Sequence, residues 1–279
     1  MRLVTYDSEA GPRVGELTDD GVFDLGFDGD MVAYIAAGAP AGERRAVGDA
    51  RLEAPLRPRS LRDFLAFEGH LKAALSRLGR PIPDEWYEVP AYYKGLPDTV
   101  IGPDEEIPWP EWTDHLDHEL ELAAVIGREV RDVSAAEADA CIFGYTIWND
   151  VSARDVQARE LPVGMGPGKA KDWDGSNVLG PCLVSADELD ASDLAMRVRV
   201  NGELWGEDTS ASMHHTFADM IAYASRSQTL RPGEVLGSGT AAGGSGLELD
   251  RRLAPGDVVE LEVDGIGVLR NAIGAKGAT

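Results

Sequence analysis

The chain is poor in long apolar runs and in cysteine. No apolar stretch approaches the ~20 residues that a membrane-spanning helix requires, and residues 1–6 resemble a strand rather than the apolar core of a signal peptide. We therefore expect a cytoplasmic protein with no membrane partner. The two cysteines, Cys141 and Cys182, have neither a neighbouring base nor a metal-binding spacing, so we interpret them as buried free thiols rather than as a disulfide or a nucleophile.

Positive charge is scarce as well. The formal net charge is −23, which argues against nucleic acid, because a phosphate backbone requires a basic face. It argues equally against an anionic membrane surface. Only five of the 26 basic residues are lysines, and two of these, Lys169 and Lys171, lie two positions apart. An anionic substrate would require local positive charge, from a metal ion or from a few such side chains.

The length of 279 residues leaves room for one large or two smaller domains. Residues 1–55 predict a small β domain, with three short strands separated by turns and then a helix near residues 31–37. The prolines within residues 53–60 predict a linker. We expect a second, catalytic domain at residues 61–279.

Strands predominate in this second domain. Helices are predicted at residues 60–78, with Gly79 ending the helix, at 134–141, which opens on an S-x-x-E capping box, and at 216–225. The predicted strands cover residues 119–127, 143–149, 182–184, 196–200, 235–237 and 258–263, and residues 82–113 are expected to be irregular. Strands outnumber helices and do not alternate with them regularly, which favours a β-rich α+β fold over a doubly wound parallel sheet.

The segment HELELAAVIG at residues 118–127 carries the strongest chemical signal. In a strand, its alternation places Glu119 and Glu121 on one face with Ala123 and Val125, whereas the opposite face is wholly apolar. Both faces should therefore be covered. Two neighbouring carboxylates on a covered face repel each other and lose hydration worth on the order of several kcal/mol. A divalent cation would remove both penalties.

Two alternatives compete with this interpretation. An isolated E-x-E is most often a pair of solvated side chains at an exposed edge, but a third carboxylate, Asp150, ends another apolar strand. The second alternative is zinc held by His115 and His118 with a glutamate, although no H-E-x-x-H helix or third neighbouring histidine supports it. A set of carboxylates favours a hard ion, Mg²⁺ first, with Mn²⁺ or Ca²⁺ as alternatives.

Longer motifs extend this pattern. The string GYTIWNDVSARDVQ at residues 144–157 closely resembles the fumarylacetoacetate hydrolase family, as do KDWD at 171–174, LGP at 179–181, LRPG at 230–233, GSGT at 237–240 and PGDVVE at 255–260. The resemblance covers essentially the whole chain. It implies a small N-terminal β domain followed by a larger domain of stacked, rolled mixed β-sheets, assembled as a homodimer.

The resemblance also implies the roles of individual residues. The implied metal ligands are Glu119, Glu121 and Asp150, with Asp63 left open as a fourth. His70, seven positions after Asp63, corresponds to the family's histidine base, and Glu248 corresponds to the carboxylate that orients it. The chemistry is reasonable, because an imidazole titrates near neutrality and can take a proton from water once a carboxylate holds its tautomer.

Substrate contacts are implied in the same way. Lys171 corresponds to a lysine that stabilises negative charge on the substrate oxygens. The implied substrate-facing positions are Tyr93, Arg154, Gln157 and Thr240. Asp155 is expected to form a local cap with Ser152 in an S-x-x-D pattern rather than to bind a metal.

Two departures from the family pattern bear on the substrate. The tyrosine that follows Asp-Phe in the hydrolase proper is Leu65 here, which puts fumarylacetoacetate itself in doubt. Relatives that decarboxylate oxaloacetate or cleave acylpyruvates carry T-G-T-P-x-G-V-G, whereas this chain has GTAAGG at residues 239–244. The stretch SGLEL at 245–249 favours the branch with the glutamate-assisted histidine.

The leading hypothesis is hydrolytic cleavage of a carbon–carbon bond in a 1,3-dicarbonyl, acylpyruvate-like substrate. Mg²⁺ would chelate the two oxygens, and His70 with Glu248 would activate water. The alternative is a decarboxylase, tautomerase or hydratase that acts on a β-keto acid at the same metal site. A third interpretation, a non-catalytic binding protein, is disfavoured because the carboxylates, the histidine and Lys171 occur together.

Overall fold

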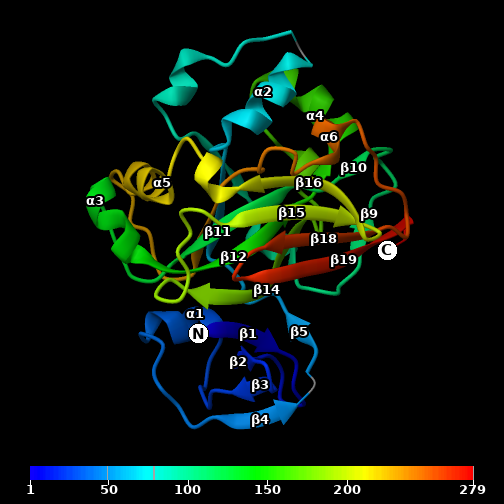
Figure 1. Ribbon diagram of the computed structural model, residues 1–279. Coiled ribbons are helices and arrows are strands. Elements are labelled where there is room, and N and C mark those ends of the chain that lie inside the picture. Colours follow the sequence, from blue (N-terminus) through cyan, green and yellow to red (C-terminus); the bar gives the residue numbers. More distant parts are fainter. Residues whose placement is uncertain (49, 78, 279) are drawn as a thin grey trace.

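The N-terminal strands form a meander, seen in a computed structural model that describes residues 1–48, 50–77 and 79–278. Its strands β1 (Arg2–Tyr6), β2 (Arg13–Thr18), β3 (Gly21–Asp24) and β4 (Arg45–Gly48) pair antiparallel in chain order, and β5 (Leu52–Glu53) pairs with β1. Helix α1 (Met31–Ala36) begins where the Asp30 side chain accepts a hydrogen bond from the Ala33 N–H group at 2.7 Å. Figure 1 shows this unit in blue, below the rest of the chain.

The meander continues into a larger central sheet. β1 pairs antiparallel with β14 (Asn177–Ser185), with Leu3 opposite Leu183. From β14 the sheet runs through β12 (Ile142–Asp150), β11 (Leu120–Ile126), β17 (Glu234–Gly237), β6 (Ser60–Phe64) and β7 (Tyr92–Gly95). The short β8 (Val100–Ile101) pairs with β14. Hydrogen bonding is thus continuous from residue 2 onward, and the division into domains at residues 1–55 and 61–279 remains a prediction.

Strand β11 has the expected two-faced character. Leu120 and Leu122 lie in one hydrophobic core, and Ala123 and Val125 lie in the other. All seven residues of the strand are buried. The prediction that both faces are covered is therefore confirmed.

A second sheet packs against the central one. It runs in the order β16 (Glu203–Thr209), β15 (Ala195–Val200), β18 (Val258–Val263), β19 (Gly267–Lys276) and β9 (Ile107–Trp109). Val198 and Leu261 share the core that contains Leu120. The β10 strand (Leu116–Asp117) pairs separately with β13 (Ser152–Ala153). Parallel and antiparallel pairs occur together, so the predicted β-rich α+β fold of mixed sheets is confirmed.

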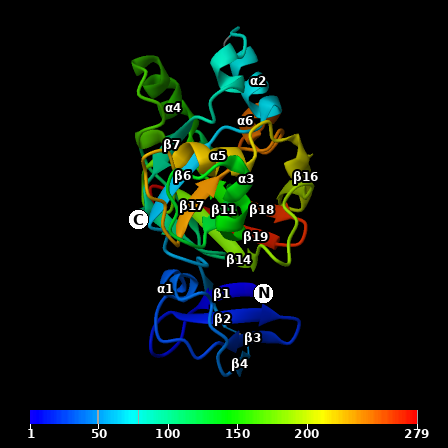
Figure 2. The same ribbon diagram turned by 90° about the vertical axis from the view of Figure 1, so that its left-hand side faces the viewer.

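The helices lie around these sheets. They are α2 (Glu68–Ser76), α3 (Ala135–Ala138), α4 (Arg154–Glu160), α5 (Phe217–Ala224) and α6 (Gly246–Leu249), with short 3-10 turns at Asp84–Tyr87, Pro97–Thr99, Asp139–Cys141, Leu161–Val163, Lys169–Lys171 and Ser210–Ser212. Figure 2 shows α2 and α4 projecting at the end opposite the N-terminal meander. Within the described part of the chain, no helix is long and apolar enough to cross a membrane.

One predicted helix is partly wrong. Residues 60–64 form strand β6, which lies between β17 and β7 and receives its hydrogen bonds from both, and the helix begins only at Glu68. Pairing with neighbouring strands overrides the local helical spacing. Gly79 does end the turn, with a φ of +65° and its N–H bonded to the Ser76 carbonyl at 3.1 Å, whereas Leu78 lies outside the described residues. The predicted irregular segment 82–113 contains the short strands β7, β8 and β9.

Other local predictions agree with the structure. Glu137 accepts hydrogen bonds from the Ser134 N–H and hydroxyl groups at 3.1 and 2.7 Å, as expected of the capping box. Cys141 and Cys182 are both free and buried.

Candidate metal centre

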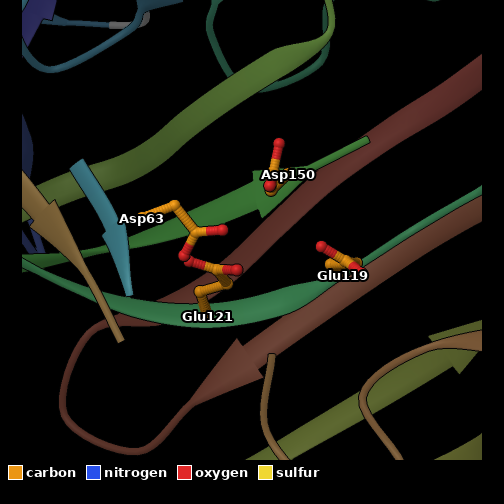
Figure 3. A group of neighbouring side chains, drawn as sticks. All are labelled: Asp63, Glu119, Glu121 and Asp150. Carbon is orange, nitrogen blue, oxygen red and sulfur yellow. The ribbon is translucent and has the colours of Figure 1, made fainter. Parts of the chain in front are cut away.

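Four carboxylates from three strands of the central sheet meet at one place. Glu121 lies in β11 and Glu119 directly precedes it, while Asp150 ends β12, which pairs antiparallel with β11. Asp63 lies in β6, on the far side of β17. One oxygen from each carboxylate lies within 4.8 Å of the others, and in Figure 3 the carboxylates of Asp63 and Glu121 face each other. We call these four residues the acidic cluster.

The absence of a side chain at Gly237 makes room for this cluster. Gly237 is in β17, paired with Ala123 on one side and with Asp63 on the other. A Cβ atom at this position would lie 2.5 Å from an oxygen of Glu121 and 2.6 Å from the Trp148 ring. Glycine therefore lets the Glu121 carboxylate cross over β17 toward Asp63.

The cluster is buried and short of hydrogen bonds. Glu121 and Asp150 are completely buried, and Asp63, the most exposed member, has only 6% of its surface accessible. Among the residues that the structure describes, neither oxygen of Glu121 has a hydrogen-bond partner, and one oxygen each of Asp63 and Asp150 also lacks one. Buried acceptors without partners are costly. A hard divalent cation ligated by oxygen would satisfy them, so these residues fit such an ion.

Zinc fits this site less well. Among the residues that the structure describes, the cluster contains only carboxylates, and neither His115 nor His118 belongs to it. The ring of His118 packs instead near Trp205, with the ring centroids 5.6 Å apart. The donor set is the one that Mg²⁺, Mn²⁺ or Ca²⁺ prefers.

Burial raises the pKa of three carboxyl groups in the cluster. It holds the pKa values of Asp63 and Glu121 well above the usual range, and the charges of neighbouring carboxylates act in the same direction. Burial also raises the pKa of Asp150, although Lys171 opposes this effect. In the absence of a cation, burial therefore favours the protonated forms of Asp63 and Glu121.

Glu119 behaves in the opposite way. Burial by itself would raise its pKa, but Arg154, Lys171 and His70 outweigh burial and place the pKa below the usual range. An Arg154 guanidinium nitrogen lies 2.7 Å from a Glu119 oxygen. The Lys171 ammonium contacts both Glu119 and Asp150. Glu119 therefore stays ionised through its basic neighbours.

Lys171, from the 3-10 turn Lys169–Lys171, brings a buried positive charge to the cluster. Burial favours its neutral form, but Asp150 and Glu119 raise the pKa of this lysine above its ordinary value. The neighbouring Lys169 is exposed and instead donates to the carbonyl group of Asp172. Tyr93 completes this side: its hydroxyl donates to Asp150 at 2.5 Å, and its ring centroid lies 5.3 Å from the Lys171 nitrogen.

His70 and Glu248 form a buried pair beside the cluster. His70 lies in α2 and Glu248 in α6, and Nδ1 of His70 is 3.0 Å from a Glu248 carboxylate oxygen. Glu248 also accepts hydrogen bonds from the Gly243 N–H group at 3.0 Å and the Ser245 hydroxyl at 2.9 Å. Because these two groups hold the carboxylate, it can in turn hold the imidazole in one orientation.

The remaining implied substrate contacts lie close by. Gln157 accepts a hydrogen bond from Arg154 at 3.1 Å. Thr240 is buried in the segment after β17, where the N–H group of Ala241 bonds to the Leu120 carbonyl at 2.9 Å. Thr240 is thus next to the start of β11.

The expected cap between Ser152 and Asp155 is wrong. Ser152 belongs to strand β13, and its hydroxyl donates to the Asp150 carbonyl at 3.1 Å. The Asp155 side chain accepts hydrogen bonds from the Thr113 hydroxyl at 2.5 Å and the Asp114 N–H at 3.0 Å. The helix starts one residue later than the S-x-x-D pattern requires, because strand pairing extends through Ala153.

Two residues in this region were given no role in the sequence interpretation. Gly237 is one, and Asp117 is the other: Asp117 is 1% exposed and accepts a hydrogen bond from Arg154 at 2.8 Å. A signal for Asp117 is present, because the period of two that links Glu119 and Glu121 extends back to position 117. For Gly237, only the approach of another strand's side chain shows why it matters.

A rolled, β-rich α+β fold around a buried set of acidic metal ligands defines a class of metal-dependent enzymes. Residues 60–274 match the family model described as fumarylacetoacetate (FAA) hydrolase C-terminal, so the chain belongs to the fumarylacetoacetate hydrolase family. This confirms the resemblance seen in the motifs.

Relatives with different activities are similar over nearly the whole chain. Oxaloacetate tautomerase FAHD2A, mitochondrial, from Homo sapiens is 30% identical to this chain, and the alignment covers 98% of this chain and 91% of that protein. The structure of 5-carboxymethyl-2-hydroxymuconate delta-isomerase from Mycobacterium smegmatis has a TM-score of 0.80 at 30% identity, covering 99% of this chain and 100% of that one. Fumarylacetoacetate hydrolase from psychrophilic Exiguobacterium antarcticum has a TM-score of 0.82 at 27% identity, covering 99% of each chain. The family thus includes a hydrolase, an isomerase and a tautomerase.

Proposed function

We propose that this protein hydrolyses a carbon–carbon bond in a 1,3-dicarbonyl substrate of the acylpyruvate type. The observation that carries the proposal is the buried pair of His70 and Glu248, 3.0 Å apart. Hydrolysis requires a base that activates water, and a histidine oriented by a carboxylate is such a base. Tautomerisation or decarboxylation does not require a water-activating pair.

The proposed cofactor is Mg²⁺, with Mn²⁺ or Ca²⁺ as alternatives. The residues that would hold it are Asp63, Glu119, Glu121 and Asp150. A bound divalent cation supplies a Lewis acid that polarises the two oxygens of a 1,3-dicarbonyl group.

The protein's own residues account for the proton transfers and the charge. His70 takes a proton from water, whose oxygen adds to the carbonyl carbon next to the bond that breaks. The electron pair of that bond passes to the departing fragment, whose remaining carbonyl group carries it as an enolate, and protonated His70 returns the proton to the enolate carbon. Lys171 stabilises the negative charge on the substrate oxygens, and Glu248 holds the His70 tautomer.

We assign supporting roles to the neighbouring polar residues. Tyr93 and Arg154 each contact a member of the acidic cluster, so they bind the substrate while orienting Asp150 and Glu119. Gln157 and Thr240 contribute further substrate contacts at the same side of the site.

The first test is the substitution His70→Ala. We expect the kcat for acetylpyruvate hydrolysis to fall about 10²–10⁴-fold, the contribution typical of a general base, while Mn²⁺ still binds. Products are identified by mass spectrometry. The control is His214→Ala, because His214 is exposed and bonds to the Tyr87 carbonyl outside this site. Retained hydrolysis in His70→Ala would sink the proposal.

A second candidate function is a decarboxylase, tautomerase or hydratase reaction on a β-keto acid. The human relative favours it, because that protein is named an oxaloacetate tautomerase and covers 98% of this chain. This reaction would use the same cluster and Lys171. Metal-dependent turnover of oxaloacetate that survives His70→Ala would establish this function in place of hydrolysis.

We also propose the setting in which the enzyme acts. Its partners are a small dicarbonyl substrate and a second copy of the chain in a homodimer, and the net charge of −23 supports the proposal that it binds neither nucleic acid nor membrane. The proposed location is the cytoplasm. Light scattering coupled to size exclusion measures the mass, and a monomer of 29.9 kDa would contradict the homodimer.

A further inference from the structure

Asp117, two positions before Glu119, accepts hydrogen bonds from two parts of the site, Arg154 and helix α6. One carboxylate oxygen accepts from Nε of Arg154 at 2.8 Å and from the Leu247 N–H group at 3.0 Å. The other accepts from the Gly246 N–H group at 2.9 Å and from the His118 N–H group at 3.0 Å. With 1% of its surface exposed, Asp117 has no solvent to replace these partners.

Arg154 and helix α6, the two parts of the site that Asp117 contacts, each carry a functional side chain. Arg154 reaches past Asp117 to Glu119, where its terminal nitrogen lies 2.7 Å from a carboxylate oxygen. Gly246 and Leu247 open helix α6, and Glu248, the next residue, contacts His70 at 3.0 Å. Asp117 is therefore the link between the metal-ligand side and the base side of the site.

Space at this link is tight. A Cβ atom at Gly246 would lie 2.7 Å from an Asp117 oxygen and 2.8 Å from the Arg251 carbonyl oxygen. The absence of a side chain thus lets α6 approach Asp117 closely enough for both N–H groups to bond.

We propose that Asp117 is a positioning residue that holds Glu119 and Glu248 at a set spacing. The inference rests on the proposed function, in which a base at His70 acts on a substrate held at the acidic cluster. Arg154 pairs with both Asp117 and Glu119, so its positive charge is divided between the two carboxylates. Arg154 can therefore orient Glu119 without fully neutralising it. At the same time Asp117 fixes the helix that carries Glu248.

Asparagine in place of Asp117 tests both effects. Either amide orientation turns one acceptor into an NH₂ donor, which then faces an N–H group of Arg154 or of α6. In Asp117→Asn we expect the Mn²⁺ dissociation constant to rise about 10–100-fold, as when an outer partner of a ligand is lost. We also expect kcat for acetylpyruvate to fall about 10²-fold with a smaller change in KM, because a misplacement near 1 Å costs this much.

A second variant separates the two effects. Gly246→Ala pushes α6 away from Asp117 without changing the charge of any residue, so we expect kcat to fall about tenfold while the Mn²⁺ dissociation constant stays within about twofold. Far-ultraviolet circular dichroism shows whether Asp117→Asn folds. If it does not, the kcat of Gly246→Ala still tests the proposal, because this variant leaves Asp117 in place.

The matched control is Asp155→Asn. Asp155 accepts a similar set of hydrogen bonds close by in the chain, from Thr113 and Asp114, but contacts neither Arg154 nor α6 through them. We expect Asp155→Asn to keep kcat and the Mn²⁺ dissociation constant within about twofold of the wild-type values. The inference is overturned if Asp117→Asn leaves the Mn²⁺ dissociation constant unchanged, if Asp155→Asn matches its losses, or if Gly246→Ala has no effect on kcat.

Mn²⁺ binding by calorimetry needs no turnover. If wild-type protein has no activity on acetylpyruvate, the proposed hydrolysis fails, and the Mn²⁺ comparison between Asp117→Asn and Asp155→Asn still decides whether Asp117 positions the metal-ligand side.

Discussion

Glu119 and Glu121 lie two residues apart at the start of β11, in surroundings that differ in charge. Glu119 contacts Arg154 and Lys171, whereas neither oxygen of Glu121 has a hydrogen-bond partner within residues 1–48, 50–77 and 79–278. Burial raises the pKa of Glu121, but at Glu119 the basic neighbours outweigh burial and lower the pKa. Near pH 8, the same side chain therefore stabilises the metal-free protein at one position and destabilises it at the other.

Amide substitutions should reveal this difference. In chelator near pH 8, we expect Glu121→Gln to unfold at or above the wild-type temperature, because a neutral amide avoids the cost of a buried charge. Glu119→Gln should lower stability by about 3 kcal/mol, since it removes one of the two carboxylate partners of each of the buried side chains of Arg154 and Lys171. Thermal and urea unfolding measure both effects.

Both variants should nevertheless bind Mn²⁺ more weakly. We expect at least the ~10–100-fold loss that follows removal of an outer partner of a ligand, measured by calorimetry. Equal stability changes of the same sign in the two variants would contradict the charge assignment.

At the scale of secondary structure, the site depends on where strands end and which strand lies between them. Asp150 ends β12, Glu119 precedes β11, and Asp63 arrives from β6 across β17. The narrow point is Gly237 in β17, where any side chain would meet Glu121 and Trp148. A strand in this position must combine regular pairing with no side chain at its last residue.

Gly237→Ala is the corresponding test. The added methyl group would lie 2.5 Å from the Glu121 carboxylate and 2.6 Å from Trp148, so β17 or Glu121 must shift. We expect a loss of about 1–3 kcal/mol in unfolding free energy, as in other overpacked interiors, together with weaker Mn²⁺ binding. Urea unfolding in chelator and calorimetry provide the two measurements. Unchanged Mn²⁺ affinity would show that Glu121 does not need this space.

At the scale of the whole molecule, burial makes the acidic cluster a link between metal binding and stability. The raised pKa values of Asp63 and Glu121 favour folding while these groups are protonated. This stabilisation is complete below the unfolded carboxyl pKa of about 4 and is lost as pH rises through the folded-state pKa values. Metal binding has the opposite dependence, because the ligands must be deprotonated.

The difference between the melting temperatures in Mg²⁺ and in chelator should therefore widen as pH rises from about 5 to about 8. At a metal concentration of 100 times the dissociation constant, the added stability is about 2.7 kcal/mol. Differential scanning calorimetry at several pH values measures the gap. A gap that stays constant with pH, or that closes at high pH, would mean that the cluster does not bind the ion through ionised carboxylates.

Local patterns were sufficient for several elements of this molecule. The alternation in residues 119–127 predicted a strand covered on both faces, and the S-x-x-E pattern at Ser134 predicted a helix start. The same alternation paired Glu119 with Glu121. Such features depend on residues within a few positions of each other, where backbone geometry alone sets which side chains share a face.

Long-range pairing decided what the local patterns missed. Residues 60–64 have helical spacing but form β6, because β17 and β7 supply their hydrogen bonds. The resemblance in the motifs, rather than any local pattern, pointed to His70 and Glu248. Only the folded chain shows that they are 3.0 Å apart.

The amino-acid sequence determined the kind of metal site: carboxylate ligands, two of them from one strand. The tertiary structure decided its composition and support, because it brought Asp63 across β17 to Glu121 and placed Asp117 between Arg154 and α6. These partners are separated by up to 130 positions in the chain. Their proximity follows from strand order and from the packing of a small residue at Gly237, neither of which a local spacing encodes.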